Sequence, residues 1–122
     1  MEARAVWLTG PRQVEIRTEP LPPVGPDHVL VRARLSAISH GTEMLVYRGE
    51  VPAHLPLDLP TLAGSFAYPI KYGYASVGEI EAAGPEVETL RPGDLVFALH
   101  PHQDRYVIPA RLAVPLPAGL DP

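Results

Sequence analysis

The sequence predicts a mainly β domain with one or two short helices, and three observations lead to that prediction. The 122 residues include 16 prolines, which oppose long helices and central strands. Several short segments alternate apolar and polar residues or are rich in β-branched residues, as half-buried strands are. Glycines recur between strand-like residues from Gly73 to Gly93, where they predict tight turns and bulges in a curled antiparallel sheet.

The predicted strands are separated by residues that favour turns and loops. In chain order they cover residues 3–8, 14–17, 28–36, 74–82, 95–99 and 105–108. Thr-Gly-Pro at 9–11 predicts the turn between the first two strands.

One short helix is predicted over residues 42–47, with Gly49 placed to end it because glycine readily adopts the left-handed conformation of a helix C-terminus. Prolines cluster at 20–26, 52–60 and 115–122, which predicts loops or connectors there. The Pro- and Leu-rich segment 52–67 is long enough to line or cover a pocket.

Composition narrows the classes of function. A formal net charge of −4 and the lack of a basic cluster argue against a nucleic-acid partner. No apolar run is long enough to span a bilayer, and the N-terminal sequence lacks the pattern of a signal peptide, so we expect a cytoplasmic protein without a membrane partner. The absence of cysteine excludes a disulfide framework.

Three motifs in order resemble the medium-chain dehydrogenase/reductase superfamily. Its glycine signature is matched by Gly73, Gly78, Gly84 and Val87. A Pro-Gly-Asp-x-Val motif follows at 92–96, and a Gly-Thr-Glu turn precedes the signature at 41–43. The resemblance covers nearly the whole chain and implies that residues 1–122 form a GroES-like substrate domain, a partly open β-barrel.

Two stretches are similar in more detail to the bacteriochlorophyllide hydroxyethyl dehydrogenase subgroup. They are Ser39-His40-Gly41-Thr42-Glu43, with Gly49 a few residues later, and Gly73-Tyr74-Ala75-Ser76-Val77-Gly78. This resemblance implies oxidation of an alcohol to a ketone or the reverse reaction on a small-molecule substrate, and it does not identify that substrate.

The positions of the family's catalytic zinc ligands are altered. The resemblance places His40 where zinc-dependent members have Cys, and Tyr74 and Ala75 where they have His and Glu. A phenol stays protonated at neutral pH and is a poor zinc ligand, and alanine offers no ligand atom. With no cysteine for a structural zinc lobe either, we predict no bound metal.

The chain contains no Gly-x-Gly-x-x-Gly motif, which a Rossmann cofactor domain uses to hold a dinucleotide pyrophosphate. We therefore expect the N-terminal part of a dehydrogenase, inactive alone, whose NAD or NADP binds mainly to a domain outside this chain. The resemblance also implies that Gly41 and Thr42 lie beside the cofactor and leaves a homo-oligomer possible.

The resemblance implies a set of site residues, and each has a structural alternative. Thr42 matches the hydroxyl that contacts the substrate oxygen and relays its proton, or it opens the helix. His40 could act as a general acid or base, or be structural. Tyr74 could hydrogen-bond a carbonyl oxygen, or simply pack. Ser39 and His100 complete the predicted substrate pocket.

Three acidic or metal-ligating features have simpler explanations. The sequence His100-Pro101-His102 with Asp104 suggests a metal site, but Pro101 interrupts the strand and a polar loop is the commoner explanation. Glu43 suits the positive end of the helix dipole, and Asp94 suits a turn. We assign neither Glu43 nor Asp94 to chemistry and expect no metal at this segment, while His100 keeps its predicted contact with substrate.

The predicted function of the intact enzyme is hydride transfer between NAD(P) and a secondary alcohol or carbonyl. Hydrogen bonds from Thr42, Tyr74 or His40 would then stabilise the developing alkoxide in place of zinc. Two alternatives remain: a stand-alone GroES-like module that binds without catalysis, and part of an enoyl or quinone reductase, against which the Gly-Thr-Glu turn argues.

Overall fold

The structure is a computed structural model that describes residues 1–57, 64–117 and 119–120. Its elements, in chain order, are β1 (Glu2–Gly10), β2 (Gln13–Pro20), β3 (His28–Ser36), α1 (Thr42–Arg48), β4 (Ser76–Ala83), β5 (Leu95–Ala98), β6 (Arg105–Pro109), the 3-10 helix η1 (Ala110–Leu112) and β7 (Val114–Pro115). The described residues are therefore mostly β, as the sequence predicts.

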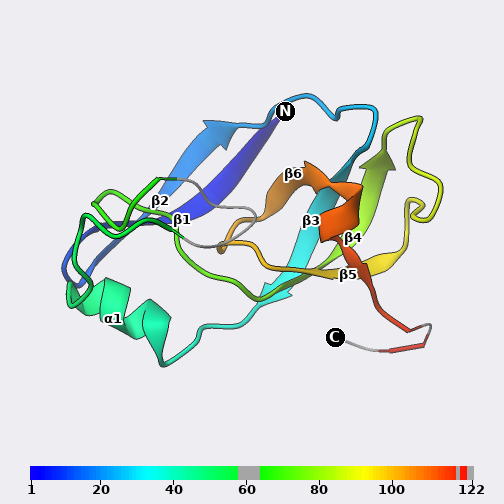
Figure 1. Cartoon of the computed structure of the whole chain (residues 1–122). Coiled ribbons are helices and arrows are strands. Elements are labelled where there is room, and N and C mark those ends of the chain that lie inside the picture. Colours follow the sequence, from blue (N-terminus) through cyan, green and yellow to red (C-terminus); the bar gives the residue numbers. More distant parts are fainter. Residues whose placement is uncertain (58–63, 118, 121–122) are drawn as a thin grey trace.

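Two antiparallel sheets make up the domain (Figure 1). One is the β1–β2 hairpin, and the other has five strands in the order β6-β3-β4-β5-β7. Strand β1 also pairs briefly with two other segments, through the bridges Ala5–Gln103 and Leu8–Ile70. These open sheets form the expected partly open, GroES-like barrel.

The six predicted strands and the predicted helix are confirmed, with β1 and β2 somewhat longer than expected. Helix α1 ends where glycine predicts, since Gly49 has the left-handed φ of 77° and its N–H bonds back to the last turn. Strand β7, in which Val114 and Pro115 pair with β5, is not predicted from the sequence. A two-residue strand at a sheet edge, one of them proline, leaves almost no periodic pattern.

Glycine is required for different structural reasons at different positions of the sequence motifs. A Cβ on Gly78 would lie 2.6 Å from the carbonyl oxygen of Arg32 on the neighbouring strand, and one on Gly84 would lie 2.2 Å from that of Gly25. Close backbone approach therefore requires glycine at both positions. Gly93, in the Pro-Gly-Asp-x-Val motif that follows the signature, instead has a φ of 96°, which suits a turn. The register of β3 against β4 shifts twice, so the predicted bulges are present.

The apolar core has two parts. The larger part lies on the five-stranded sheet and includes Val29, Val31, Ile80, Val96 and Tyr106. The smaller part joins the hairpin to α1 through Leu8, Val46 and Ile70, with Phe66 and Tyr72 packed against them. Helix α1 lies beside the turn of the β1–β2 hairpin (Figure 1), where Arg12 N–H donates to the carbonyl of Tyr47 over 2.6 Å.

The predicted long loop, 52–67, is only partly within the described residues, because 58–63 lie outside them. Its two described ends meet at the isolated bridge between Pro56 and Ser65. Phe66 packs against the smaller part of the core, so this end of the loop is held close to α1. Residues 118 and 121–122 of the predicted C-terminal connector also lie outside the described residues.

Candidate functional site

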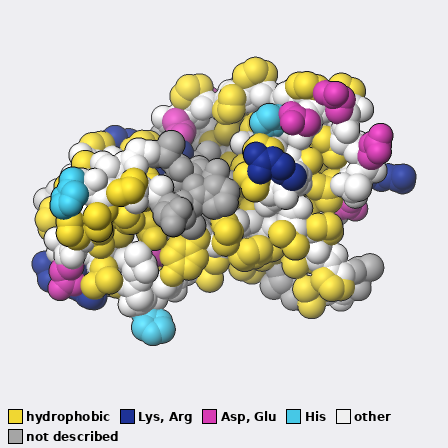
Figure 2. Space-filling model, in the orientation of Figure 1, with side chains coloured by type: hydrophobic (Ala, Val, Ile, Leu, Met, Phe, Trp, Pro, Cys, Tyr) yellow, Lys and Arg dark blue, Asp and Glu magenta, His cyan; other side chains and the backbone are white. Residues whose placement is uncertain are grey.

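A hollow of about 240 Å³ opens between β1, α1 and the segments that carry Tyr72 and His102. Most of its walls are apolar. Its lining residues are Val6, Leu8, Val14, Ile38, Glu43, Met44, Tyr47, Tyr72 and His102. Apolar side chains also cover much of the visible surface of the molecule (Figure 2), and Val14 and Ile38 at this hollow are 56% and 73% exposed.

A hydrogen-bonded chain of three side chains runs through the wall of this hollow. The two members that line the hollow are Glu43, whose side chain is 7% exposed, and His102, at 14%. His102 Nε2 lies 2.5 Å from Glu43 Oε1, and His102 Nδ1 lies 2.6 Å from Ser36 Oγ. Because a carboxylate only accepts hydrogen bonds, Nε2 carries the proton of the first bond.

The remaining oxygen of Glu43 is also held. Glu43 Oε2 accepts the backbone N–H of Ser39 over 2.7 Å. Two hydrogen bonds therefore fix a buried carboxylate beside an apolar hollow, and they leave part of its capacity to accept hydrogen bonds unused. An isolated polar group in such surroundings is costly, so this pairing is what allows Glu43 to be buried.

Gly73 makes room for the imidazole of His102. A Cβ on Gly73 would lie 2.8 Å from His102 Nε2 and 3.0 Å from its Cδ2. The first glycine of the signature is therefore in contact with the hydrogen-bonded pair, and any side chain there would displace the ring. This contact explains the position of Gly73 without an appeal to backbone strain.

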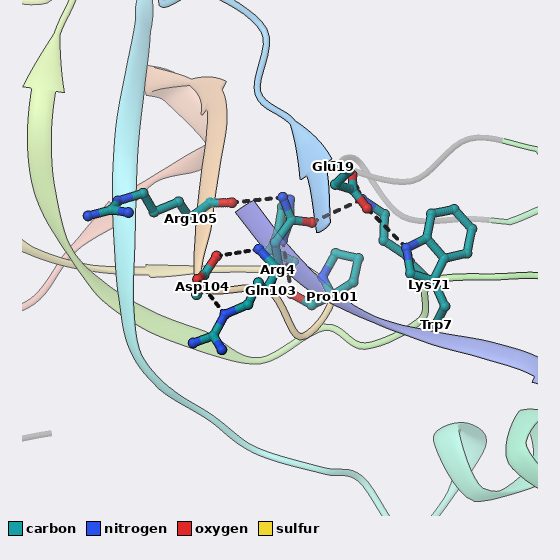
Figure 3. A network of polar contacts seen from close by, with 9 residues as sticks. Arg4, Trp7, Glu19, Lys71, Pro101, Gln103, Asp104 and Arg105 are labelled. Atoms are coloured by element: carbon teal, nitrogen blue, oxygen red, sulfur yellow. Dashed lines mark hydrogen bonds and ion pairs between the residues drawn. The ribbon is translucent and has the colours of Figure 1, made fainter. Parts of the chain in front are cut away.

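A polar network fixes the segment that carries His102 against the hairpin (Figure 3). Lys71 Nζ donates to Glu19 on β2 over 2.8 Å and to Gln103 Oε1 over 2.9 Å. Trp7 Nε1 donates to the other oxygen of Glu19, and Arg4 N–H donates to Asp104 Oδ1 over 2.7 Å. The two residues that follow His102 are thus tied to the rest of the fold.

Two tyrosines lie next to the hollow. Tyr72 lines it, and the ring of Tyr74 meets that of Tyr72 edge-on with centroids 6.1 Å apart. Burial raises the pKa of Tyr72, with smaller contributions from Tyr74 and Glu43 that act in the same direction. Tyr72 therefore remains a protonated hydrogen-bond donor at neutral pH.

The structure separates the other residues predicted from the sequence. Thr42 and His40 are exposed, and neither lines the hollow. Gly41 is the N-cap of α1 without a side-chain cap bond, so Thr42 is the first helical residue rather than a cap. Ser39 contributes its backbone N–H to Glu43, and its Oγ accepts the N–H of Gly41 over 3.2 Å.

His100 lies in the core of the five-stranded sheet instead of at the hollow. Its ring stacks on Tyr106 with centroids 3.8 Å apart, and Nδ1 donates to the carbonyl of Pro101 over 2.9 Å. Burial lowers the pKa of His100 to about 4. Tyr106 in turn donates to Ser76 Oγ over 2.9 Å. His100 is therefore neutral at pH 7, and its predicted contact with substrate stays a prediction.

The described residues do not fit a metal ion. Among them, no group of three His, Cys, Asp or Glu side chains is arranged to hold one. His102 uses both ring nitrogens in hydrogen bonds, and Glu43 is its partner. His102 therefore has no ring nitrogen free to act as a ligand without breaking one of these bonds.

The family model described as the alcohol dehydrogenase GroES-like domain matches residues 25–117. The chain belongs to this family. It is 37% identical over 80% of its length to a 2-desacetyl-2-hydroxyethyl bacteriochlorophyllide A dehydrogenase from Cereibacter sphaeroides. It is 36% identical over 77% of its length to a Mycobacterium tuberculosis protein named "probable zinc-binding alcohol dehydrogenase". The chain spans only 27% and 21% of these two relatives.

Solved structures share the fold of this GroES-like domain. A Sinorhizobium meliloti protein described as a "putative zinc-binding dehydrogenase" bound to NADP superposes over 100% of the chain and 40% of its own length, with a TM-score of 0.71 and 20% identity. The resemblance predicted from the glycine signature is thus confirmed at the level of family and fold. Within the part of the chain that the structure describes, no helix is long and apolar enough to cross a membrane.

The hydrogen-bonded pair of Glu43 and His102 in the wall of the hollow is not predicted from the sequence. Glu43 had a sufficient local explanation in the helix dipole, and His102 was grouped with His100 and Asp104 as a polar loop. The pair is separated by 59 residues, so no local pattern joins it. The available signal was that Glu43 ends the Gly-Thr-Glu motif and that His102 follows the Pro-Gly-Asp-x-Val motif by six residues, and neither fact specifies that they touch.

Proposed function

We propose that this chain is the substrate-side domain of a zinc-independent, NAD(P)-dependent enzyme that interconverts a secondary alcohol and a ketone. The observation that carries the proposal is the apolar hollow with the Glu43–His102 pair in its wall, next to the Gly-Thr-Glu turn of a domain in the alcohol dehydrogenase family. An apolar pocket with few, firmly held polar groups is typical of small-molecule sites.

Zinc independence is supported by the residues at the expected ligand positions. His40 is exposed, Tyr74 packs edge-on against Tyr72, and Ala75 has no ligand atom. Glu43 and His102 form a hydrogen bond with each other instead. We therefore expect hydrogen bonds, rather than a Lewis acid, to stabilise charge on the substrate oxygen.

The nicotinamide cofactor, when bound, would exchange a hydride with the substrate carbon. This chain has no dinucleotide-binding glycine motif, so its residues do not supply the pyrophosphate site. The exposed turn of Gly41 and Thr42 is the part of the domain that we expect to face the cofactor. There the Thr42 hydroxyl, able to donate and accept, would relay the substrate's proton to solvent.

His40 and Tyr74 have supporting roles in this proposal. His40 precedes the same exposed turn, where its imidazole would exchange protons with solvent. Tyr74 is half-buried beside Tyr72, and its hydroxyl would donate to a carbonyl oxygen. A cytoplasmic location and a homo-oligomeric state are also part of the proposal.

The test is the activity of the protein expressed from its complete gene. Reduction of NAD⁺ or NADP⁺ by secondary alcohols, with metal analysis finding less than stoichiometric zinc, is the expected result. Thr42→Ala should lower kcat by about 10²-fold or more, whereas Thr42→Ser, which keeps the hydroxyl, should remain active. Small-molecule binding without any NAD(P)-linked turnover would instead identify a non-catalytic binding module.

A further inference from the structure

The carboxylate of Glu43 is oriented more firmly than a structural role in α1 requires. A glutamate that only favours the helix dipole would lie exposed in the first turn, as charged side chains ordinarily do. Glu43 is instead 6% exposed and lines an otherwise apolar hollow. Both of its oxygens accept a hydrogen bond, one from the backbone N–H of Ser39 and the other from His102.

The bonding pattern leaves Glu43 with acceptor capacity and no donor capacity. A carboxylate offers about four acceptor positions, and among the residues that the structure describes two of them are used. The bond from His102 Nε2 supplies the proton in that contact, and Ser36 holds the ring from its other nitrogen. The rest of the lining is apolar except for the hydroxyls of Tyr47 and Tyr72. A ligand in the hollow therefore meets an acceptor at Glu43.

We propose that this hollow binds small apolar alcohols whose hydroxyl group donates a hydrogen bond to Glu43, with His102 as a positioning residue that holds the carboxylate. This inference rests on the proposed function and specifies the substrate class for it. The cavity of about 240 Å³ is slightly smaller than the range of roughly 300–1,000 Å³ typical of ligand pockets, so the ligand is a compact molecule.

In the oxidation direction the alcohol O–H bond breaks as its proton passes to Glu43, which becomes a carboxylic acid. NAD(P)⁺, when bound, would accept the hydride of the carbinol carbon with its electron pair, and the ketone would form. The proton then leaves Glu43 to water once the product has departed. A carboxyl group that gains this proton keeps its bond to Ser39 N–H, because its other acceptor positions are unchanged.

The ligand preference can be measured on the 122-residue chain without a cofactor. The probes are 1-phenylethanol and acetophenone, which have the same heavy atoms and differ in that only the alcohol donates a hydrogen bond. We expect both to shift the NMR signals of Ile38, Met44 and Tyr72. The alcohol should bind about tenfold more tightly, because only it can donate to the buried carboxylate.

Glu43→Gln is the decisive variant, because glutamine has nearly the same shape and adds an N–H donor. The tenfold preference for the alcohol should fall at least threefold, while the exposed Glu50→Gln variant on the same segment keeps it. A ratio of affinities is used because it cancels changes in folding or in the number of competent molecules. Glu43→Asp, which keeps the charge, should retain most of the preference.

Three results would overturn the inference: binding of neither probe, shifts confined to residues away from the hollow, or an unchanged preference in Glu43→Gln. These outcomes differ from failure of the proposed function. If the preference depends on Glu43 but the protein from the complete gene oxidises no alcohol, the ligand site stands and the dehydrogenase proposal fails. If the protein turns over alcohols but Glu43→Gln keeps the preference, the reverse holds.

Discussion

Lowering the pH from 7 to 5 should destabilise this domain through His100. The residue is 7% exposed and its ring stacks on Tyr106 in the core of the five-stranded sheet. Burial lowers the pKa of His100 from 6.5 to about 4, because a charged imidazole would lose its hydration there. At pH 5 the folded state therefore keeps His100 neutral, whereas the unfolded chain protonates it.

The size of the effect follows from this difference in proton binding. Between roughly pH 6.5 and 4 the unfolded state binds more protons, so the free energy of unfolding falls as the pH falls. With a pKa of 6.5 in the unfolded state and about 4 in the folded state, the loss is about 2 kcal/mol between pH 7 and pH 5. Such a loss is a large share of the stability of a small domain.

The measurement is urea unfolding followed by circular dichroism at pH 7 and pH 5. In His100→Phe an aromatic ring still stacks on Tyr106 but does not titrate. The free energy of unfolding of this variant should therefore fall by about 2 kcal/mol less than that of the wild type between pH 7 and pH 5. His54→Gln, at an exposed position, serves as the control and should lose as much as the wild type. If His100→Phe also loses as much as the wild type, burial of neutral His100 is not the cause.

Three further substitutions test the packing. Gly84→Ala would put a Cβ 2.2 Å from the carbonyl oxygen of Gly25, and calorimetry should show a loss of at least about 3 kcal/mol or no folded protein; wild-type stability would refute the close approach. Tyr106→Phe removes the bond to buried Ser76, and urea unfolding should show a cost of about 1–2 kcal/mol, where no change would mean that the bond contributes nothing. Gly73→Ala would put a Cβ 2.8 Å from His102 Nε2, so the NMR signals of that ring should shift, and unchanged signals would contradict the contact.

The strands and the helix were predictable because their signals are local. Alternation over a few residues places β1 to β6, and a glycine that adopts left-handed φ ends α1 at Gly49. The glycine signature also identifies the family, since the close contacts at Gly78 and Gly84 exclude other side chains. Strand β7 was missed because its two residues become a strand only by pairing with β5.

The site was harder to predict because neighbouring residues diverge in space. Thr42 and Glu43 are adjacent, yet Thr42 is exposed while Glu43 is buried, since successive residues on a helix point about 100° apart. His100 and His102 likewise separate: one stacks in the core and the other lines the hollow. The sequence identifies the segments that form the site. Which of their side chains lines the hollow depends on the rotation of the helix about its axis and on the path of the chain.

The sequence by itself determined the β-rich architecture and the family, because both depend on residue types at short, fixed spacings. Only the tertiary structure decided that Glu43 and His102, which are 59 residues apart, share a hydrogen bond in the wall of an apolar hollow. That bond requires α1, the segment before β6 and the space beside Gly73 to meet in one place. Their meeting depends on long-range packing, which no local pattern encodes.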